Sequence, residues 1–331
     1  MLPGAAASLQ LRRRACRKRG TRLNPPGYIV CPVTHEALRR VGNRLVTASG
    51  GHSYPVSASG IPVFAEQPAT EDSRRQQSHY DHIGAAYLEN LAYPHTEEYS
   101  RYLDGILLGV VGSGDLGLVA EICCGRGEAF RLLGGRIGAG AGVDISLTML
   151  EAAQNEPGSQ GMRFVQGDAV ALPLQSDSFD HVFMLGGIHH VNDRRALFSE
   201  VFRILKPGGR FIYREPLSDF FLWRWLRAAV YRVSPALDAQ TERPLRYAET
   251  VPFLQEAGLR PEVWRTCGFV GAALLLNSDV LVFNRLFRFL PGIRGLARAM
   301  ARLDDWTLGL RFLRHAGLQV VGAAVKPGHG Q

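Results

Sequence analysis

Short apolar runs alternate with segments of helical periodicity along most of the chain after residue 117. The apolar runs, which predict buried strands, lie at 118–123, 140–144, 162–166, 180–185, 209–214, 261–267 and 318–325. Helical spacing of apolar residues falls between them, at 127–135, 147–155, 193–205 and 247–257. Strands that alternate with helices are typical of an α/β fold with a largely parallel sheet. The pattern predicts a Rossmann-like, doubly wound sheet of seven strands.

Three of these runs lead into an acidic residue, namely Glu121, Asp144 and Asp168. Ligands of open α/β sheets bind outside the carboxyl ends of the strands, so these carboxylates should share one edge. An acid about 20 residues after a glycine loop can accept both ribose hydroxyls, and Asp144 has that spacing. The arrangement therefore predicts a nucleoside site.

The glycine loop after the first run identifies the kind of nucleoside. A dinucleotide-binding loop needs Gly-x-Gly-x-x-Gly, but its third glycine position here is Phe130 or Glu128, depending on the register. Glu121 would also repel phosphates, whereas it suits a cationic ligand. A ribose and an ammonium group without phosphates indicate S-adenosylmethionine.

The residues after this loop resemble a known family. Five motifs occur in a fixed order: Gly167-Asp168-Ala169, Leu172-Pro173, Asp177-Ser178-Phe179-Asp180, Ile188-His189-His190-Val191 and Leu205-Lys206-Pro207-Gly208-Gly209. With the loop and Asp144, they resemble the class I S-adenosylmethionine-dependent methyltransferases, in the group that includes quinone-biosynthesis enzymes, over roughly residues 78–265. Cys123 departs from the pattern, because the family usually has the first glycine of the loop there.

The resemblance implies a set of cofactor contacts. Asp168 and the amide of Ala169 would hold the adenine edge, and Leu185 and Gly186 would pass beneath the cofactor. A helix before the first strand covers the site in the family, and Tyr80 and Tyr87 share one face of such a helix. These tyrosines either contact the cofactor or pack the helix onto the sheet. The predicted cofactor residues are Glu121, Cys123, Gly125, Gly127, Asp144, Ile145, Asp168, Ala169, Leu185, Gly186, Tyr80 and Tyr87.

Candidate catalytic and substrate residues follow the fourth and fifth strands. Methyl transfer to a hydroxyl needs an oriented nucleophile and removal of a proton, for which histidine is suited. His189 and His190 are therefore candidate bases, although either could simply hydrogen-bond the loop. Glu215 could orient a substrate, and Arg214 could pair with an acidic substrate group or with a structural carboxylate.

Two insertions bear on the acceptor. Residues 216–245 are rich in aromatic residues, among them the candidate substrate contact Trp223. Residues 270–315 interleave seven arginines with apolar residues against three acids, Asp279, Asp304 and Asp305. Such segments form either a helical lid on the core or a basic amphipathic surface that meets a membrane. Both interpretations favour a hydrophobic small-molecule acceptor, such as a quinone, polyketide or lipid precursor.

The N-terminal part is organised differently. Residues 1–27 are basic and contain no acid, which is compatible with a solvated tail, an over-long gene start, a targeting segment or a nucleic-acid arm. Residues 28–66 read as short β segments and resemble the Trm112-like domain, which activates or precedes several methyltransferases. Its metal-binding relatives use four cysteines, and only Cys31 is present here, so no metal is expected. Residues 67–77 are the predicted linker, and 78–331 the methyltransferase domain.

Composition adds modest constraints. The net charge of +8 rests on 35 arginines and three lysines among 38 basic residues, a skew more typical of a GC-rich genome than of a binding surface. Five cysteines without a paired framework favour a reducing compartment such as the cytoplasm. Besides a small-molecule methyltransferase, two alternatives stay open, a methyltransferase of RNA or of a translation protein and a non-catalytic S-adenosylmethionine-binding partner. The oligomeric state is undetermined.

Overall fold

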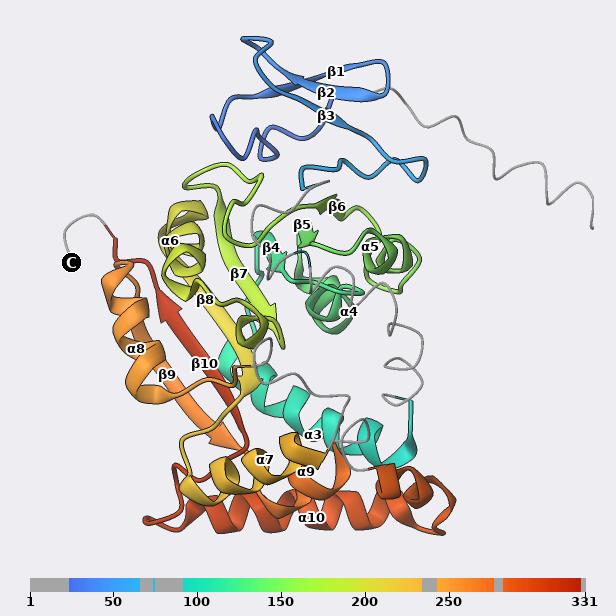
Figure 1. Cartoon of the computed structure of the whole chain (residues 1–331), viewed down its shortest axis with the longest axis vertical. Helices are drawn as coiled ribbons and strands as arrows, with labels where there is room; N and C mark the ends of the chain where they lie inside the picture. The colour runs from blue at the N-terminus through green and yellow to red at the C-terminus, as the bar shows by residue number, and fades with distance from the viewer. Residues whose placement is uncertain (1–23, 66–73, 75–91, 234–242, 277–281, 329–331) are drawn as a thin grey trace, which may run out of the picture.

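The computed structural model describes residues 24–65, 74, 92–233, 243–276 and 282–328. A seven-stranded sheet forms its centre, in the order β6-β5-β4-β7-β8-β10-β9 (Figure 1). The strands are β4 (Leu118–Ile122), β5 (Ala139–Asp144), β6 (Arg163–Gln166), β7 (Phe179–Leu185), β8 (Leu205–Pro216), β9 (Arg260–Cys267) and β10 (Gln319–Val325). All neighbours pair in parallel except β10, which is antiparallel to β8 and β9. The predicted doubly wound α/β fold is confirmed.

Helices cover both faces of this sheet, and each face has its own apolar core. On one face lie α6 (Arg194–Ile204) and α8 (Tyr247–Glu256). The other face carries α3 (Pro94–Val111), α4 (Glu128–Leu133), α5 (Leu147–Ala153), α9 (Val270–Leu275) and α10 (Ile293–Gly309). The strands β4, β5 and β10 are largely apolar because both of their faces are buried, whereas the edge strand β9 is mostly polar and only partly buried.

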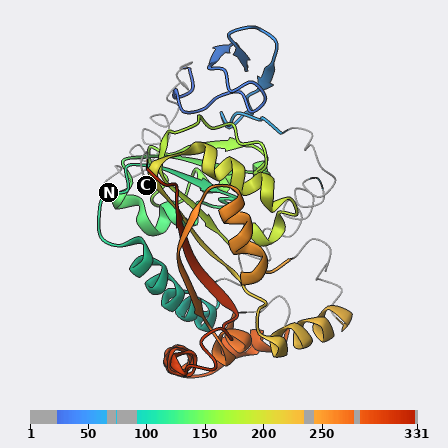
Figure 2. The same cartoon turned by 90° about the vertical axis from the view of Figure 1, so that its left-hand side faces the viewer.

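The predicted insertions form helices at one end of the molecule. Residues 216–245 contain α7 (Phe221–Val233), and residues 270–315 contain α9, the 3-10 helix η3 (Val282–Phe289) and α10. In both views, α7 and α10 lie at the end opposite the N-terminal strands (Figures 1 and 2). Within the described residues, no helix is long and apolar enough to cross a membrane.

A small antiparallel sheet precedes the large one, in line with the short β segments predicted for residues 28–66. It consists of β1 (Leu38–Val41), β2 (Arg44–Thr47) and β3 (Ser53–Pro55). Residues 28–34 are not a strand of this sheet, because they form only isolated bridges, from Ile29 to Leu174 and from Val30 to Ala37, followed by a turn. These bridges join the segment partly to the large domain and not to the small sheet.

The segment that leaves the small sheet continues along the exposed edge of the large one. Val63 forms a parallel bridge with Gln166 of β6, where the Phe64 amide donates to the Gln166 carbonyl at 2.8 Å. The Gln166 side chain donates to the carbonyls of Ala65 and Ile145. The N-terminal part therefore covers a sheet edge that would otherwise present unpaired backbone groups.

Several predictions fall outside the described residues. They concern residues 1–23 of the predicted tail, the predicted linker 67–77 apart from residue 74, and Tyr80 and Tyr87. These remain predictions.

Candidate active site

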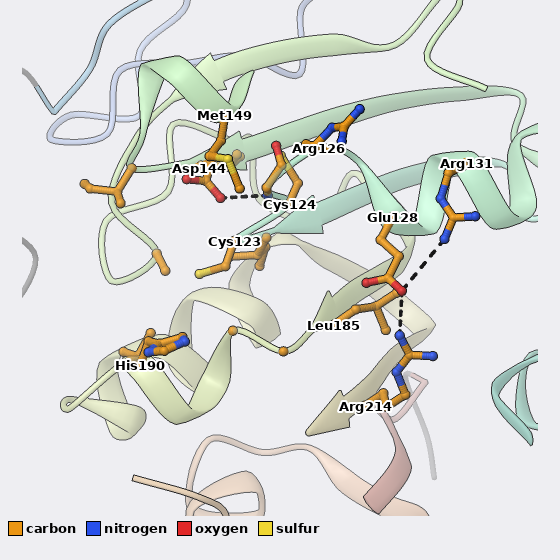
Figure 3. A pocket seen from close by; sticks show the side chains of 18 of the residues that line it. Cys123, Cys124, Arg126, Glu128, Arg131, Asp144, Met149, Leu185, His190 and Arg214 are labelled. Carbon is orange, nitrogen blue, oxygen red and sulfur yellow. Dashed lines mark hydrogen bonds and ion pairs between the residues drawn. The ribbon is translucent and has the colours of Figure 1, made fainter. Parts of the chain in front are cut away.

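A cavity of about 880 Å³ lies at the carboxyl edge of the sheet, between the ends of β4, β5 and β7 and the helix α3 (Figure 3). It is the place at which a doubly wound sheet binds its ligands. The predicted site residues that line it are Cys123, Gly125, Asp144, Ile145, Asp168, Ala169, Leu185, Gly186, His190 and Arg214. The structure thus brings together residues that are up to 91 positions apart in the chain, from Cys123 to Arg214.

Asp144 is fixed in the cavity wall by backbone amides. Its Oδ2 accepts from the Gly125 amide at 2.8 Å and its Oδ1 from the Ser146 amide at 2.9 Å. Both contacts orient the carboxylate at the end of β5 (Figure 3). A carboxylate has about four lone-pair directions, so Asp144 can also accept from ligand hydroxyls.

Asp168 has a similar position after β6. Its Oδ1 accepts from the Val170 amide at 3.1 Å, and its side chain and Ala169 both border the cavity. The loop therefore presents a carboxylate acceptor beside a backbone amide. This pair can recognise an edge that carries both a donor and an acceptor, as adenine does.

The loop after β4 is wound into left-handed backbone conformations. The φ angles of Cys123, Gly125 and Gly127 are 49°, 50° and 79°. This conformation costs little for glycine but is unfavourable for other residues, which explains why Cys123 is the irregular position of the loop. Burial raises the pKa of the Cys123 thiol well above its usual range, so the thiol stays protonated.

Glu121 does not line the cavity, which corrects the expectation that it faces a cationic ligand. Its Oε1 accepts from the Ala129 amide at 2.8 Å and its Oε2 from the Phe130 amide at 3.4 Å. These are amides of the first turn of α4, which have no partner within the helix, so the carboxyl oxygens of Glu121 satisfy two of them. Burial raises the pKa of Glu121 to about 8. Glu121 therefore holds the start of α4 and has no contact with the cavity. Gly127, the residue that precedes α4, does not line the cavity either.

Arg214 forms a charged bridge across the cavity wall. From β8, its Nη2 donates to Glu128 of α4 at 2.6 Å (Figure 3). Its Nη1 donates to Asp104 of α3 at 2.7 Å. Burial opposes the charge of Arg214, but Glu128 and Asp104 outweigh it and raise the pKa of the guanidinium. Of the two roles considered for Arg214, the structure shows the pairing with structural carboxylates.

The two histidines of the 3-10 helix η2 (Ile188–His190) have different environments. His189 does not line the cavity, and its Nδ1 lies 2.8 Å from Oε2 of the buried Glu215. Glu215 also accepts from the amides of Gly187 and Ile188, each at 2.8 Å. His190 lines the cavity, with its ring 3.8 Å from that of His189 between centroids.

Burial sets the protonation states of His189 and Glu215. It raises the pKa of Glu215 to about 7, and together with Arg194 and Arg227 it lowers the pKa of His189 to about 3. His189 is therefore neutral. Glu215 does not line the cavity, so it holds the histidine loop in place and does not meet a substrate there, in contrast to the expectation.

Trp223 is also placed differently from the expectation of a substrate contact. Its Nε1 donates to the Ala316 carbonyl at 2.7 Å, and its ring packs against Phe269 with 5.2 Å between centroids. Trp223 thus anchors α7 to the end of the sheet and does not line the cavity.

Sequence reasoning missed the contribution of α3. Glu97, Ser100, Arg101 and Asp104 of this helix line the cavity. They are spaced by three, one and three residues and so share one helical face. The run of polar residues at this spacing within an otherwise apolar helix was the feature that could have identified them.

The family comparison matches the part of the chain that builds this cavity. Residues 120–213 match the family described as "Methyltransferase domain". The demethylmenaquinone methyltransferase of Lactococcus lactis subsp. lactis is 38% identical over 103 residues, which cover 29% of this chain and 41% of that protein. The chain thus spans less than half of the length of this curated relative.

Solved structures share the fold at low sequence identity. A complex between the Haloferax volcanii Trm112 methyltransferase activator and a putative methyltransferase matches with a TM-score of 0.52 and 21% identity, over 76% of this chain and 98% of the matched one. Phosphoethanolamine N-methyltransferase 2 of Haemonchus contortus, solved with S-adenosyl-L-methionine, matches with a TM-score of 0.50 and 18% identity. The match covers 76% of this chain and 60% of the matched one.

Proposed function

We propose that this chain, which carries a methyltransferase domain with the class I fold, methylates an oxygen or a carbon of a hydrophobic small molecule. S-adenosylmethionine is the expected methyl donor. The proposal rests above all on one observation, that Asp144, Asp168 and His190 border the same cavity at the carboxyl edge of the sheet. This arrangement combines a nucleoside site with a candidate base.

The cavity residues fit S-adenosylmethionine chemically. Asp144 offers carboxylate oxygens to the ribose hydroxyls, and Asp168 with the Ala169 amide offers an acceptor and a donor to adenine. Ile145, Met149 and Leu185 supply apolar surface between them. When bound, the donor supplies a methyl group on a sulfonium, a leaving group that needs no further activation. The protein's residues have to position the acceptor and manage its proton.

His190 is the histidine that we assign to this proton. It borders the cavity, whereas His189 lies behind it on Glu215. The Glu215 carboxylate receives amide hydrogen bonds from Gly187 and Ile188 and thereby fixes the loop that carries both histidines. In this assignment His190 accepts the proton of an acceptor hydroxyl, and Glu215 with His189 positions it.

A quinone-type acceptor has the most support among hydrophobic small molecules. The name of the Lactococcus lactis relative refers to demethylmenaquinone, and the similarity to it covers 29% of this chain. Near His190 the cavity is bordered by Val170 and Val191, which suit an apolar ring or tail more than a charged one.

The experiment incubates the purified full chain with S-adenosylmethionine labelled in the methyl group and, in separate reactions, with demethylmenaquinone chemically reduced to its quinol, with total lipid extract or with RNA. The quinol supplies the hydroxyl that the proposed step needs. Label in the quinone or in the lipid fraction is the expected result, and Asp144→Ala sets the background. Label in RNA alone would refute the small-molecule acceptor. Cofactor binding without label in any fraction would show a binding protein and refute the enzyme.

We further propose that residues 28–66 are a Trm112-like module without a metal. The small antiparallel sheet β1-β2-β3 supports it. Cys31 Sγ lies 3.1 Å from Tyr54 Oη, and no group of three metal-ligating side chains occurs among the described residues. Metal analysis of the purified protein tests the proposal, and one equivalent of bound zinc would contradict it.

A further inference from the structure

One end of the molecule carries an unusual number of exposed apolar side chains. They belong to α7, to η3 and to α10 with the turn after it, and we call this surface the basal face. It is marked by Phe221, Trp225, Leu286, Phe289, Trp306 and Phe312, and the last of these is 81% exposed. In Figures 1 and 2, α7 and α10 lie at this end, farthest from the N-terminal strands.

The helix α10 shows that this exposure follows from the fold. Ala297, Ala301 and Leu308 are buried against the domain and share one side of the helix. Leu303 and Trp306 point to the opposite side, where they are 48% and 66% exposed. The helix is therefore apolar on both sides, and only one side has a partner within the described residues.

The charge on the basal face is mainly positive. Exposed arginines accompany the apolar residues, including Arg224, Arg302 and Arg311. Of the two acids of α10, Asp304 is buried and accepts from Tyr99 Oη at 2.5 Å. Asp305 is 51% exposed, but it accepts from Tyr102 Oη at 2.8 Å and pairs with Arg265, so its charge is offset locally. Arg302 precedes Trp306 by four residues, so charge and apolar surface occur on the same side of α10.

We infer that the basal face binds the surface of a membrane that contains anionic lipids. A helix that lies in the interface presents aromatic and aliphatic side chains to the acyl boundary and arginines to the headgroups. A second copy of this chain fits less well, because a symmetric contact would place arginines of both copies together. An anionic bilayer satisfies both the apolar and the positive character of the face.

Binding of the basal face to a membrane would bring the cavity near the lipid. The helix α3 separates the basal face from the cavity, since Tyr99 and Tyr102 contact α10 while Glu97 and Asp104 line the cavity. A protein seated in this way would hold its cavity close to the lipid phase. The inference goes beyond the proposed function and is independent of methyl transfer, because it is tested by binding alone.

The test is flotation of the full chain with vesicles of phosphatidylcholine alone and of phosphatidylcholine mixed with phosphatidylglycerol. We expect binding to the mixed vesicles that weakens as salt is raised. Trp306→Glu should lower the bound fraction about tenfold. Arg302→Gln and Arg311→Gln should each lower it about fivefold in the mixed vesicles.

Matched controls come from the N-terminal part of the chain, at the opposite end. Val33 is as exposed as Trp306, at 66%, and Arg39 is also exposed, so Val33→Glu and Arg39→Gln should leave flotation unchanged. Unchanged thermal unfolding shows that the variants are folded. Equal flotation of the basal and control variants, or no flotation at all, overturns the inference. So does a dimer that Trp306→Glu dissociates in a protein that does not float.

Discussion

Cys123 lies directly against Gly187, at the point where the loops after β4 and β7 meet. A Cβ placed on Gly187 would be only 2.6 Å from the Cβ of Cys123 and 3.2 Å from its sulfur. Gly187 has no side chain, and this leaves the space that the side chain of Cys123 occupies.

This relationship predicts non-additive stabilities. Gly187→Ala should lower the free energy of unfolding by about 1–3 kcal/mol, because the new methyl group overlaps Cys123. Cys123→Gly removes the unfavourable left-handed conformation of a non-glycine residue. It also removes buried side-chain atoms and raises the entropy of the unfolded chain. Because these effects oppose each other, the free energy of unfolding should change by no more than about 1 kcal/mol. Urea unfolding of the double variant should recover most of the loss. Additive effects of the two substitutions would contradict the contact.

Removal of the Asp144 carboxylate should disable cofactor binding. Hydrogen bonds to a charged group contribute about 1.5–3 kcal/mol each, so losing two ribose contacts predicts a fall in affinity of about 100-fold or more. Isothermal calorimetry of Asp144→Ala with S-adenosylmethionine measures it. Asp115→Ala is a suitable control, because Asp115 also accepts from a backbone amide, that of Gly117, but lies outside the cavity lining. Unchanged affinity in the Asp144 variant would disprove the site assignment.

The periodicity of the sequence was sufficient to predict the large sheet. Period-two and buried apolar runs are local properties, and each predicted strand from 118–123 to 318–325 has a counterpart in β4 to β10. The edge at which Asp144 and Asp168 meet follows from strand direction, which is also implicit in an alternating pattern.

Side-chain direction within the site was not predictable in this way. Glu121 and Asp144 both follow apolar runs, yet Glu121 turns under the loop to the amides of α4 while Asp144 faces the cavity. Which amides meet each carboxyl group depends on how the loop between β4 and α4 is wound, because the Gly125 amide donates to Asp144 and the Ala129 amide to Glu121. This winding is a tertiary feature. Likewise, the partner of Arg214 is Asp104, 110 residues earlier, and no local pattern links them.

Glu121 should make folding sensitive to pH. Its pKa is raised to about 8 in the folded chain, so the folded state holds a proton that the unfolded state releases at about pH 4.5. The contribution of this group to the free energy of unfolding is therefore fully present below about pH 4.5 and is lost as the pH rises towards 8. Each pKa unit corresponds to about 1.4 kcal/mol, so the whole window amounts to a few kcal/mol.

Glu121→Gln cannot titrate and should remove this dependence. Chemical unfolding of both proteins at several pH values between 5 and about 8 would show the variant gaining stability relative to the wild type as pH rises. A constant difference across this range would mean that the carboxylate is ionised in the folded state throughout, against the predicted effect of its burial.

Removal of the Arg214 side chain should lower the free energy of unfolding. Arg214→Met leaves Asp104 and Glu128 beside each other in the cavity wall without their shared counterion. Removing one partner of a buried ion pair costs about 3–5 kcal/mol, and the 12% exposure of the Arg214 side chain favours the lower part of this range. Urea unfolding of the variant measures the loss.

Arg131→Met provides the matched control for Arg214. Arg131 approaches the same Glu128, at 3.9 Å, but its side chain is 48% exposed, so its removal should cost less than about 0.5 kcal/mol. Equal effects of the two substitutions would show that the bridge contributes no more than a surface contact.

His190 and His189 should differ in how their removal affects turnover. If His190 accepts the acceptor proton, His190→Ala should lower kcat by about 100-fold or more while the affinity for S-adenosylmethionine changes little. His189→Ala should instead remove the side-chain partner of the buried Glu215, which keeps only its backbone amide donors; this should lower stability and shift the loop that carries His190. Its effect on turnover should therefore come together with a lower unfolding temperature. Steady-state kinetics combined with thermal unfolding separates the two, and a full rate of transfer by His190→Ala would remove the general base from the mechanism.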